Sequence, residues 1–122
     1  MQVNEHDINP KEIVLEFLEA LNRKEFKSAR NYVGDKVTYM APLNSFNGAE
    51  PYFKYVEHLN LPKLDIKKVF TEGSNDVCVL WEVNYSSPPA PIFVSAWYQV
   101  HDGKISSMKL VFDPRPLLQQ QI

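Results

Sequence analysis

The first regular pattern along the chain is an apolar residue every three or four positions, which is the spacing of one helix face. Its members are Ile13, Val14, Phe17, Leu18 and Leu21, with Glu16, Glu19 and Asn22 on the opposite side. Asn9 is a suitable N-cap, Pro10 suits the first helical turn, and we expect Glu12 to complete a capping box with the Asn9 amide. Ile8 is spaced to form a hydrophobic staple with Ile13. The sequence therefore predicts a helix beginning at Pro10.

Shorter patterns follow this helix. We expect a second, short helix over residues 25–33, which Gly34 and Asp35 would end. Val37–Ala41 is rich in β-branched and aromatic residues and predicts a strand, after which residues 43–48 (LNSFNG) form a polar loop. A third helix is predicted over residues 49–58, where Pro51 is tolerated because it lies in the first turn.

From Leu64 onward the pattern becomes that of β-strands. The predicted strands are Leu64–Thr71, Val77–Tyr85, Ile92–Val100 and Ile105–Phe112. Gly73–Asp76 is typical of a tight turn, SSPPAP of a stiffer loop, and Asp102-Gly103 of a two-residue hairpin turn. Helices followed by a meander of antiparallel strands indicate an α+β protein.

Two of these strands, VCVLWEVNY and IFVSAWYQV, are largely apolar on both faces. A strand from a sheet with one solvated face should instead alternate apolar and polar residues. We therefore expect helices or a cavity on one face and another subunit on the other. Phe93 and Trp97 lie on the second face, and the predicted partner there is a second copy of the chain, in a homodimer.

Composition and charge narrow the classes of function. At 122 residues the chain is long enough for one domain with a packed core, and we expect a single domain over residues 1–122. The net charge is −2 and no basic run is present, which argues against nucleic acid binding. No apolar stretch reaches the roughly 20 residues of a membrane span, and the polar, acidic start is unlike a signal peptide. Cys78 is the single cysteine, so no internal disulfide can form. We expect a cytoplasmic protein.

Several segments together resemble the nuclear transport factor 2-like superfamily, in its SnoaL-like and ketosteroid isomerase-like branch. These segments are EIVLEFLEALNRKEFKSA, VTYMAP, Gly48 before the third helix, and HDGKISSMKLVF. The resemblance implies a cone-shaped α+β fold in which three N-terminal helices pack on a strongly curved, mostly antiparallel sheet. This scaffold carries isomerases, cyclases, dehydratases and binding modules, so the resemblance alone does not select a function.

Ketosteroid isomerases use three residues in the cone: a base at the end of the first strand, a helix tyrosine, and a protonated aspartic acid on a later strand. When the spacing is carried over, the base position falls on Ala41 and the tyrosine position on Phe17. The aspartic acid position falls on Ala96, or on Ser95 if the hairpin is one residue shorter. The side chains of Phe17, Ala41 and Ala96 neither donate hydrogen bonds nor move protons. We therefore expect no isomerase activity by that mechanism.

The resemblance also implies which side chains point into the cone. Strand parity places Val37, Val83, Tyr85, Leu110 and Phe112 there, with Tyr52 available from the third helix. The predicted ligand-binding residues are Phe17, Tyr39, Ala41, Tyr55, Val56, Trp81, Ala96, Tyr98 and Met108. This aromatic-rich set suits a small apolar or aromatic molecule held by one or two polar contacts. The alternative is that the same side chains pack as an ordinary core.

Other residues with reactive side chains give weaker indications. The three histidines, His6, His58 and His101, are far apart in sequence, and we expect them to be solvated or to cap a helix end. Nothing predicts a metal or cofactor site. Asp113 and Arg115 could close the mouth of the cone with an ion pair that selects an anionic ligand, or form a solvated pair after the strand.

Two further side chains are predicted to point away from the cone. Glu82 should lie on the outer face of the sheet or at an interface. Cys78 should be a small buried apolar residue.

Two functional hypotheses remain open from the sequence. The first is a small-molecule binding protein, or an enzyme of isomerase, cyclase or dehydratase type, that uses the cone. The second is an interaction module that dimerises through the sheet and keeps a vestigial cavity.

Overall fold

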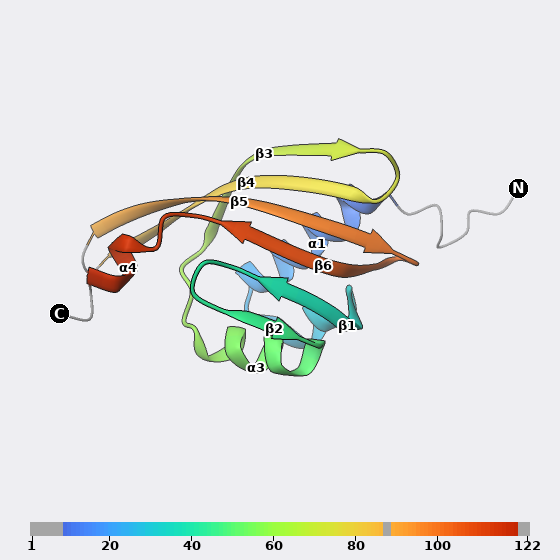
Figure 1. Ribbon diagram of the computed structural model, residues 1–122, viewed down its shortest axis with the longest axis horizontal. Coiled ribbons are helices and arrows are strands. Elements are labelled where there is room, and N and C mark those ends of the chain that lie inside the picture. The colour runs from blue at the N-terminus through green and yellow to red at the C-terminus, as the bar shows by residue number, and fades with distance from the viewer. Residues whose placement is uncertain (1–8, 87–88, 120–122) are drawn as a thin grey trace, which may run out of the picture.

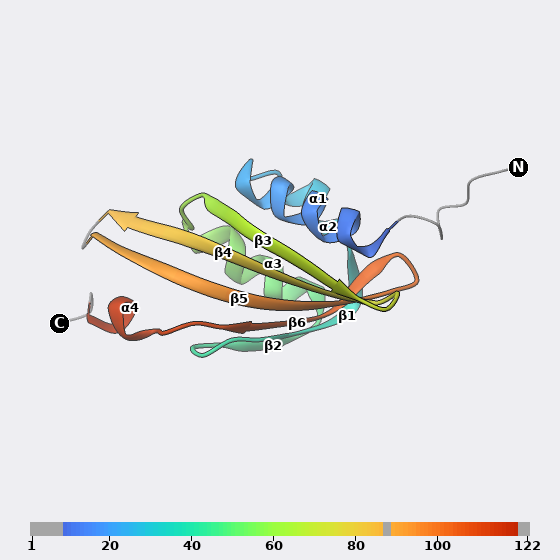
Figure 2. The same ribbon diagram turned by 90° about the horizontal axis from the view of Figure 1, so that it is seen from above.

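Helices α1 and α3 pack on one side of a six-stranded sheet, and the other side of the sheet faces outward (Figures 1 and 2). The computed structural model describes residues 9–86 and 89–119. The elements are α1 (Pro10–Asn22), α2 (Phe26–Arg30), β1 (Val33–Met40), β2 (Ser45–Asn47), α3 (Ala49–His58), β3 (Leu64–Glu72), β4 (Asp76–Ser86), β5 (Pro89–His101), β6 (Lys104–Val111) and α4 (Arg115–Gln119). No helix in the described ranges is long and apolar enough to span a membrane.

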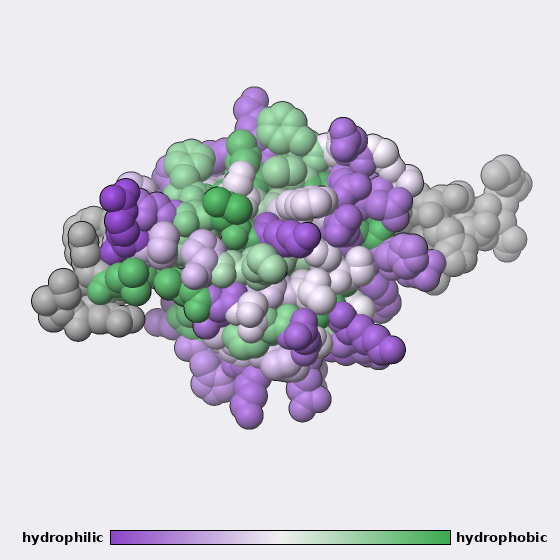
Figure 3. Space-filling view, viewed as in Figure 1, coloured by the Kyte–Doolittle hydropathy of each residue, from purple (hydrophilic) through white to green (hydrophobic). Residues whose placement is uncertain are grey.

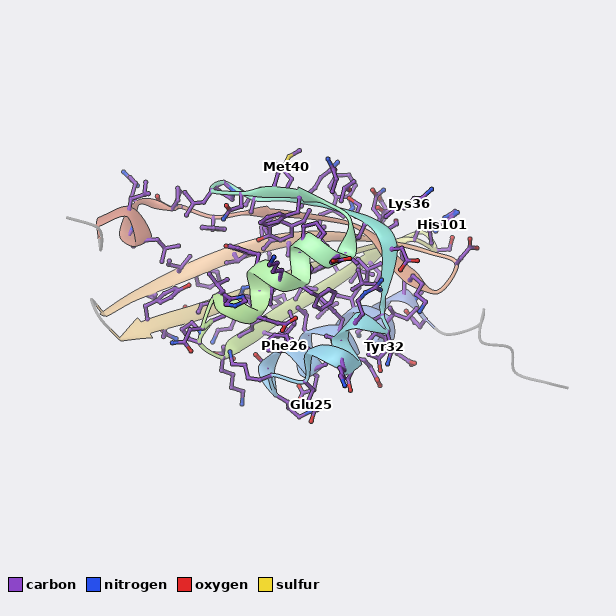
Figure 4. All side chains as sticks on the ribbon, turned by 90° about the horizontal axis from the view of Figure 1, so that it is seen from below. Glu25, Phe26, Tyr32, Lys36, Met40 and His101 are labelled. Atoms are coloured by element: carbon purple, nitrogen blue, oxygen red, sulfur yellow. The ribbon has the colours of Figure 1, made fainter. Side chains whose placement is uncertain are left out.

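The strand order is β2-β1-β6-β5-β4-β3. β1 pairs in parallel with β6, and the other neighbouring strands are antiparallel. The sheet is strongly curved and does not close, so its concave side partly surrounds α3, which lies between β1 and the two N-terminal helices in Figure 4. The predicted α+β fold class, with helices on a curved and mostly antiparallel sheet, is confirmed.

The N-terminal helix begins where the sequence predicted. The Asn9 side chain accepts a hydrogen bond of 2.8 Å from the Lys11 amide and caps α1. The predicted capping box is wrong in its second half, because Glu12 contributes only its backbone amide, bonded to the Asn9 carbonyl at 2.9 Å. Ile8, the other half of the expected staple, lies outside the described residues.

The predicted end of the second helix is wrong. α2 stops at Arg30, and Gly34 and Asp35 do not end a helix but lie within β1, which already starts at Val33. Val33 is fully buried and pairs with Ile105 of β6. Because a helix this short gains little from its own hydrogen bonds, pairing with the sheet decides the conformation of a β-branched residue.

Two elements were missed in segments expected to be irregular. β2 lies inside the LNSFNG segment, where the Phe46 ring packs 5.8 Å from Tyr39 and 5.0 Å from Tyr55, measured between centroids. This contact holds the segment against β1 as an edge strand. The short helix α4 follows Pro114, and Asp113 caps it by accepting the Arg115 amide at 3.0 Å.

The concave side of the sheet carries the core. The predicted inward residues Val37, Tyr39, Trp81, Val83, Ala96, Tyr98 and Met108 are all buried. Phe17 of α1 connects the layers, with its ring 6.5 Å from Tyr52 of α3 and 6.3 Å from Tyr98 of β5. Strand parity read from the sequence is therefore confirmed for the inner face.

The outer face of the sheet carries exposed apolar side chains among polar ones, and no described element covers it. Figure 3 shows this face, with hydrophobic side chains gathered over the strands. Phe93 is 59% exposed and Trp97 43% exposed, and they are accompanied by Met40, Phe70 and Val111. Met40 points away from the helices in Figure 4.

Cys78 lies on the outer face between its cross-strand partners Phe70 and Trp97. Its direction was predicted correctly, but it is half-buried rather than buried because nothing covers that face. Glu82 also lies on the outer face, as predicted. Its neighbours across the strands are Asp65 of β3 and Phe93 of β5.

Candidate functional site

A small cavity lies between β1, the C-terminal half of α3 and the strands β4, β5 and β6, and it opens to solvent beside α4. Its volume is about 100 Å³. Its lining residues are Tyr39, Ala41, Leu43, Asn44, Tyr55, Leu59, Leu61, Leu64, Trp81, Val83, Tyr85, Ile92, Val94, Leu110, Phe112 and Leu117. Concave sites lined mainly by apolar and aromatic side chains, with a few polar groups, are typical of small-molecule binding.

Of the predicted ligand-binding residues, the structure brings Tyr39, Ala41, Tyr55 and Trp81 together at this cavity. The other five predicted ligand-binding residues do not line it. These residues are Phe17, Val56, Ala96, Tyr98 and Met108, all of them buried in the core. The ring of Phe17 and its aromatic neighbours pack the cone at the end near α1, and the cavity lies toward α4.

The sequence did not identify the residues that form the rim of the cavity. Leu43 and Asn44 come from the turn between β1 and β2, Leu59 and Leu61 follow α3, and Leu117 comes from α4. The signal available in the sequence is a set of leucines in segments without helical or strand periodicity. Such leucines have no regular apolar face to join, so they pack where the tertiary structure brings loops together.

The hydrogen bond between Asn44 and Tyr55 orients one polar group of the cavity. The Asn44 amide nitrogen donates to the Tyr55 hydroxyl oxygen at 3.1 Å. Burial raises the pKa of Tyr55, although the Asn44 hydrogen bond lowers it in part. Tyr55 therefore stays protonated near neutral pH, and its own proton remains free for another acceptor.

Tyr39 supplies the second polar group. The residue is 9% exposed, and its hydroxyl has no hydrogen-bond partner within the described part of the chain. No fully enclosed side-chain oxygen or nitrogen in that part lacks a partner, so the Tyr39 hydroxyl must retain some open space, which the cavity provides. Burial, with smaller contributions from Tyr55 and Tyr85, raises the pKa of Tyr39 well above that of a free phenol. Tyr39 is therefore a hydrogen-bond donor.

None of the described residues that line the cavity is charged. Asp113 and Arg115 lie near Leu117 but are exposed, and their side chains pair at 2.7 Å. The Arg115 guanidinium lowers the pKa of Asp113 to about 2, and the pair caps α4. The sequence allowed either an ion pair that closes the mouth of the cone or a solvated pair after the strand, and the structure shows a solvated pair.

The ketosteroid isomerase positions hold no substitute for the missing groups. Ala96 faces the core while its neighbour Ser95 is exposed on the outer face, so Ala96 is the structural counterpart. Ala41 lines the cavity with a methyl group. The described lining contains neither a carboxylate nor an imidazole that could transfer a proton in the manner of a general base.

Neither His58 nor His101 lines the cavity. His58 is exposed, with its ring nitrogen Nδ1 2.7 Å from the Lys54 carbonyl, and His101 is exposed beside Asp102. His6 lies outside the described residues. Across residues 9–86 and 89–119, no three His, Cys, Asp or Glu side chains are placed to hold a metal ion.

Two of the larger hollows among the described residues are wide surface grooves on the helical side and beside the hairpin turns. One of about 470 Å³ runs beside the start of α1, and one of about 900 Å³ separates α2 from α3. Asp76 and Asp102 contribute to the first, and Lys27, Arg30 and Glu57 to the second. Grooves that water enters freely weaken polar contacts with a small ligand.

The family model for a SnoaL-like domain matches residues 14–108. A nuclear transport factor 2-like protein of unknown function from Cytophaga hutchinsonii is 33% identical, with 97% of this chain and 99% of that chain covered and a TM-score of 0.84. An LEH-like epoxide hydrolase from M. tuberculosis is similar in fold at 17% identity, with 89% and 86% of the two chains covered and a TM-score of 0.75. No curated protein matches the chain.

Proposed function

The chain belongs to the SnoaL-like domain family of the nuclear transport factor 2-like superfamily, and we propose that it binds a small, uncharged apolar or aromatic molecule in the cavity beside Tyr39 and Trp81. The observation that carries this proposal is the composition of the lining. Its described members are apolar or aromatic apart from one amide and the phenol hydroxyls. Such a surface favours an apolar ligand that is oriented by a small number of hydrogen bonds.

Binding is proposed in preference to proton-transfer catalysis. An isomerase, cyclase or dehydratase reaction needs a group that accepts or donates a proton near neutral pH. The phenols of the cavity cannot accept a proton near neutral pH, because their raised pKa values keep them protonated, and the described lining holds no carboxylate or imidazole that could accept one in their place. The epoxide hydrolase activity named for the M. tuberculosis protein belongs to a chain only 17% identical, and it forms no part of the proposal.

Retained ligand and added ligand provide two tests. Mass spectrometry of the purified, denatured protein should detect a small molecule that is absent from an equally treated Ala41→Leu variant, whose longer side chain would occupy the cavity. Calorimetry should show saturable binding of one-ring aromatic compounds to the wild-type chain. The proposal is wrong if neither experiment distinguishes the two chains.

A second candidate function, a homodimerising interaction module, is favoured by the outer face of the sheet. Trp97 is held there by a 2.8 Å hydrogen bond from its indole nitrogen to Asp76 and by Lys109, whose ammonium lies 4.8 Å from the ring centroid. A large aromatic fixed before association loses little conformational entropy on binding, as is typical of interface anchors. A second copy of the chain would cover Trp97 and Phe93 in a self-complementary contact. The cytoplasmic location remains a prediction from the sequence.

A further inference from the structure

The hydrogen bonds in the cavity define what kind of polar group a ligand should carry. Asn44 donates to the Tyr55 oxygen at 3.1 Å, which occupies one of the two lone pairs of that hydroxyl. Because a bonded pair needs one donor and one acceptor, the Tyr55 proton points away from the Asn44 nitrogen. Tyr55 is one of the lining residues, so this proton is available to a ligand.

The Tyr39 hydroxyl offers a second proton at the same cavity. Tyr39 lies on β1 and Tyr55 on α3, and their ring centroids are 6.4 Å apart. Leaving a largely buried hydroxyl without a partner is unfavourable, because the group has lost much of its hydration without replacement. A ligand oxygen placed in the cavity within hydrogen-bond distance of both phenols would satisfy both hydroxyls. A carbonyl oxygen has two lone pairs and no proton, so it can accept from both at once.

The size of the cavity limits the rest of the ligand. Its volume is about 100 Å³, whereas an apolar cavity of about 150 Å³ holds one benzene molecule. A single ring therefore does not fit wholly inside and would extend through the open mouth, whereas a rigid ligand of several fused rings would lie mostly outside. Since none of the described lining residues is charged, a carboxylate would be desolvated without a counterion.

From these contacts we infer that the natural ligand is a neutral carbonyl compound with about one ring, whose carbonyl oxygen accepts hydrogen bonds from Tyr39 and Tyr55. Asn44 is a positioning residue, because it does not supply the proton but fixes the direction of the Tyr55 hydroxyl. The inference rests on the proposed binding function and adds the chemical class of the ligand.

Three probes of nearly the same shape test the inference by calorimetry with the full chain. Acetophenone carries the carbonyl, α-methylstyrene replaces its oxygen by a methylene group, and benzoate carries a charge. We expect acetophenone to bind roughly tenfold more tightly than α-methylstyrene, which corresponds to one or two neutral hydrogen bonds. We expect no measurable binding of benzoate.

The Asn44→Asp variant tests the positioning role. An ionised aspartate only accepts hydrogen bonds, so it would take the Tyr55 proton away from the ligand. The preference for acetophenone over α-methylstyrene should fall about threefold or more in this variant. The matched control is Asn47→Asp, which makes the same chemical change at an exposed residue of β2 outside the cavity and should keep the wild-type preference.

The outcomes separate this inference from the proposed function. If acetophenone and α-methylstyrene bind equally, or if Asn44→Asp keeps the full preference, the inference is wrong while the binding function stands. If none of the three probes binds although a retained molecule is detected, the inference alone is wrong; if no probe binds and no molecule is retained, the proposed function fails and the inference fails with it.

Discussion

The rings of Tyr39 and Tyr55 pack against each other with their centroids 6.4 Å apart, one on β1 and the other on α3, and both line a cavity whose described walls carry no charge. The two tyrosines are 16 positions apart in the sequence. The turn at Asn44 reverses the chain, and β2 then pairs with β1 before α3 begins. The Tyr39 hydroxyl has no hydrogen-bond partner among the described residues, and Asn44 orients the Tyr55 hydroxyl. Substitutions of these two tyrosines are therefore the first tests of ligand binding.

Replacing Tyr39 by phenylalanine should weaken the binding of a carbonyl ligand by about 0.5–1.5 kcal/mol, the usual net value of one neutral hydrogen bond. The fold should remain intact, since this hydroxyl bonds to no other described group. Calorimetric titration with acetophenone measures the change. Tyr32→Phe is the matched control, because the Tyr32 hydroxyl bonds to Glu16 on the surface and its loss should leave the affinity unchanged.

Two alanine-to-leucine substitutions should have opposite consequences. Ala41 lines the cavity, so Ala41→Leu should fill it and abolish binding with little change in the free energy of unfolding. Ala96 is 0% exposed in the packed core, so Ala96→Leu should destabilise the chain by about 1–3 kcal/mol through overpacking. Denaturant titration of both variants measures their free energies of unfolding for comparison with the wild-type chain. Equal destabilisation by the two changes would mean that the space at Ala41 is already filled.

Alkaline pH should reduce stability through the buried phenols. Burial raises the pKa of Tyr39, Tyr52 and Tyr98 in the folded chain, whereas in the unfolded chain each titrates near 10. Above about pH 10 the unfolded chain therefore binds fewer protons than the folded one, and the free energy of unfolding falls as pH rises.

Denaturant midpoints measured between pH 8 and pH 11.5 should decline above pH 10, and phenolate absorbance near 295 nm should complete its rise only as the chain unfolds. A flat stability profile across pH 10, with all tyrosines titrating in the folded chain, would contradict the burial of these hydroxyls.

The outer face should be the dimer contact. Phe93 is 59% exposed on that face, and Phe93→Glu should give a monomer because two charges would meet across the symmetric contact without partners. Light scattering at micromolar concentration measures the mass. Ser28→Glu makes the same change of charge on α2, on the helical side, and should leave the dimer intact. A wild-type chain that is already monomeric would refute the dimer.

The pattern of apolar and polar residues was sufficient to predict the helices and strands that bury one face. The start of α1 at Pro10, the limits of α3 and the inward parity of Trp81 and Tyr98 follow from local periodicity and capping. The strand β2 and the early start of β1 at Val33 do not, because each is fixed by partners distant in sequence: Tyr55 for Phe46, and Ile105 for Val33.

The site could be predicted only in part for the same reason. Strand parity identified Tyr39 and Trp81, but parity cannot tell how far the aromatic core extends into the cone. Ala96 was expected to contact a ligand, and it is fully buried in the core instead. Asn44 was missed because its importance lies in one hydrogen bond to Tyr55, and no local pattern encodes such a bond.

The most direct test of the binding proposal is an NMR measurement of where a neutral aromatic ketone sits on the protein. With acetophenone bound, we expect nuclear Overhauser effects between its methyl protons and the ring protons of Tyr39, Tyr55 and Trp81, and none in Ala41→Leu. Contacts confined to Phe93 and Trp97 on the outer face, or no contacts at saturating ketone, would contradict a ligand-binding cavity.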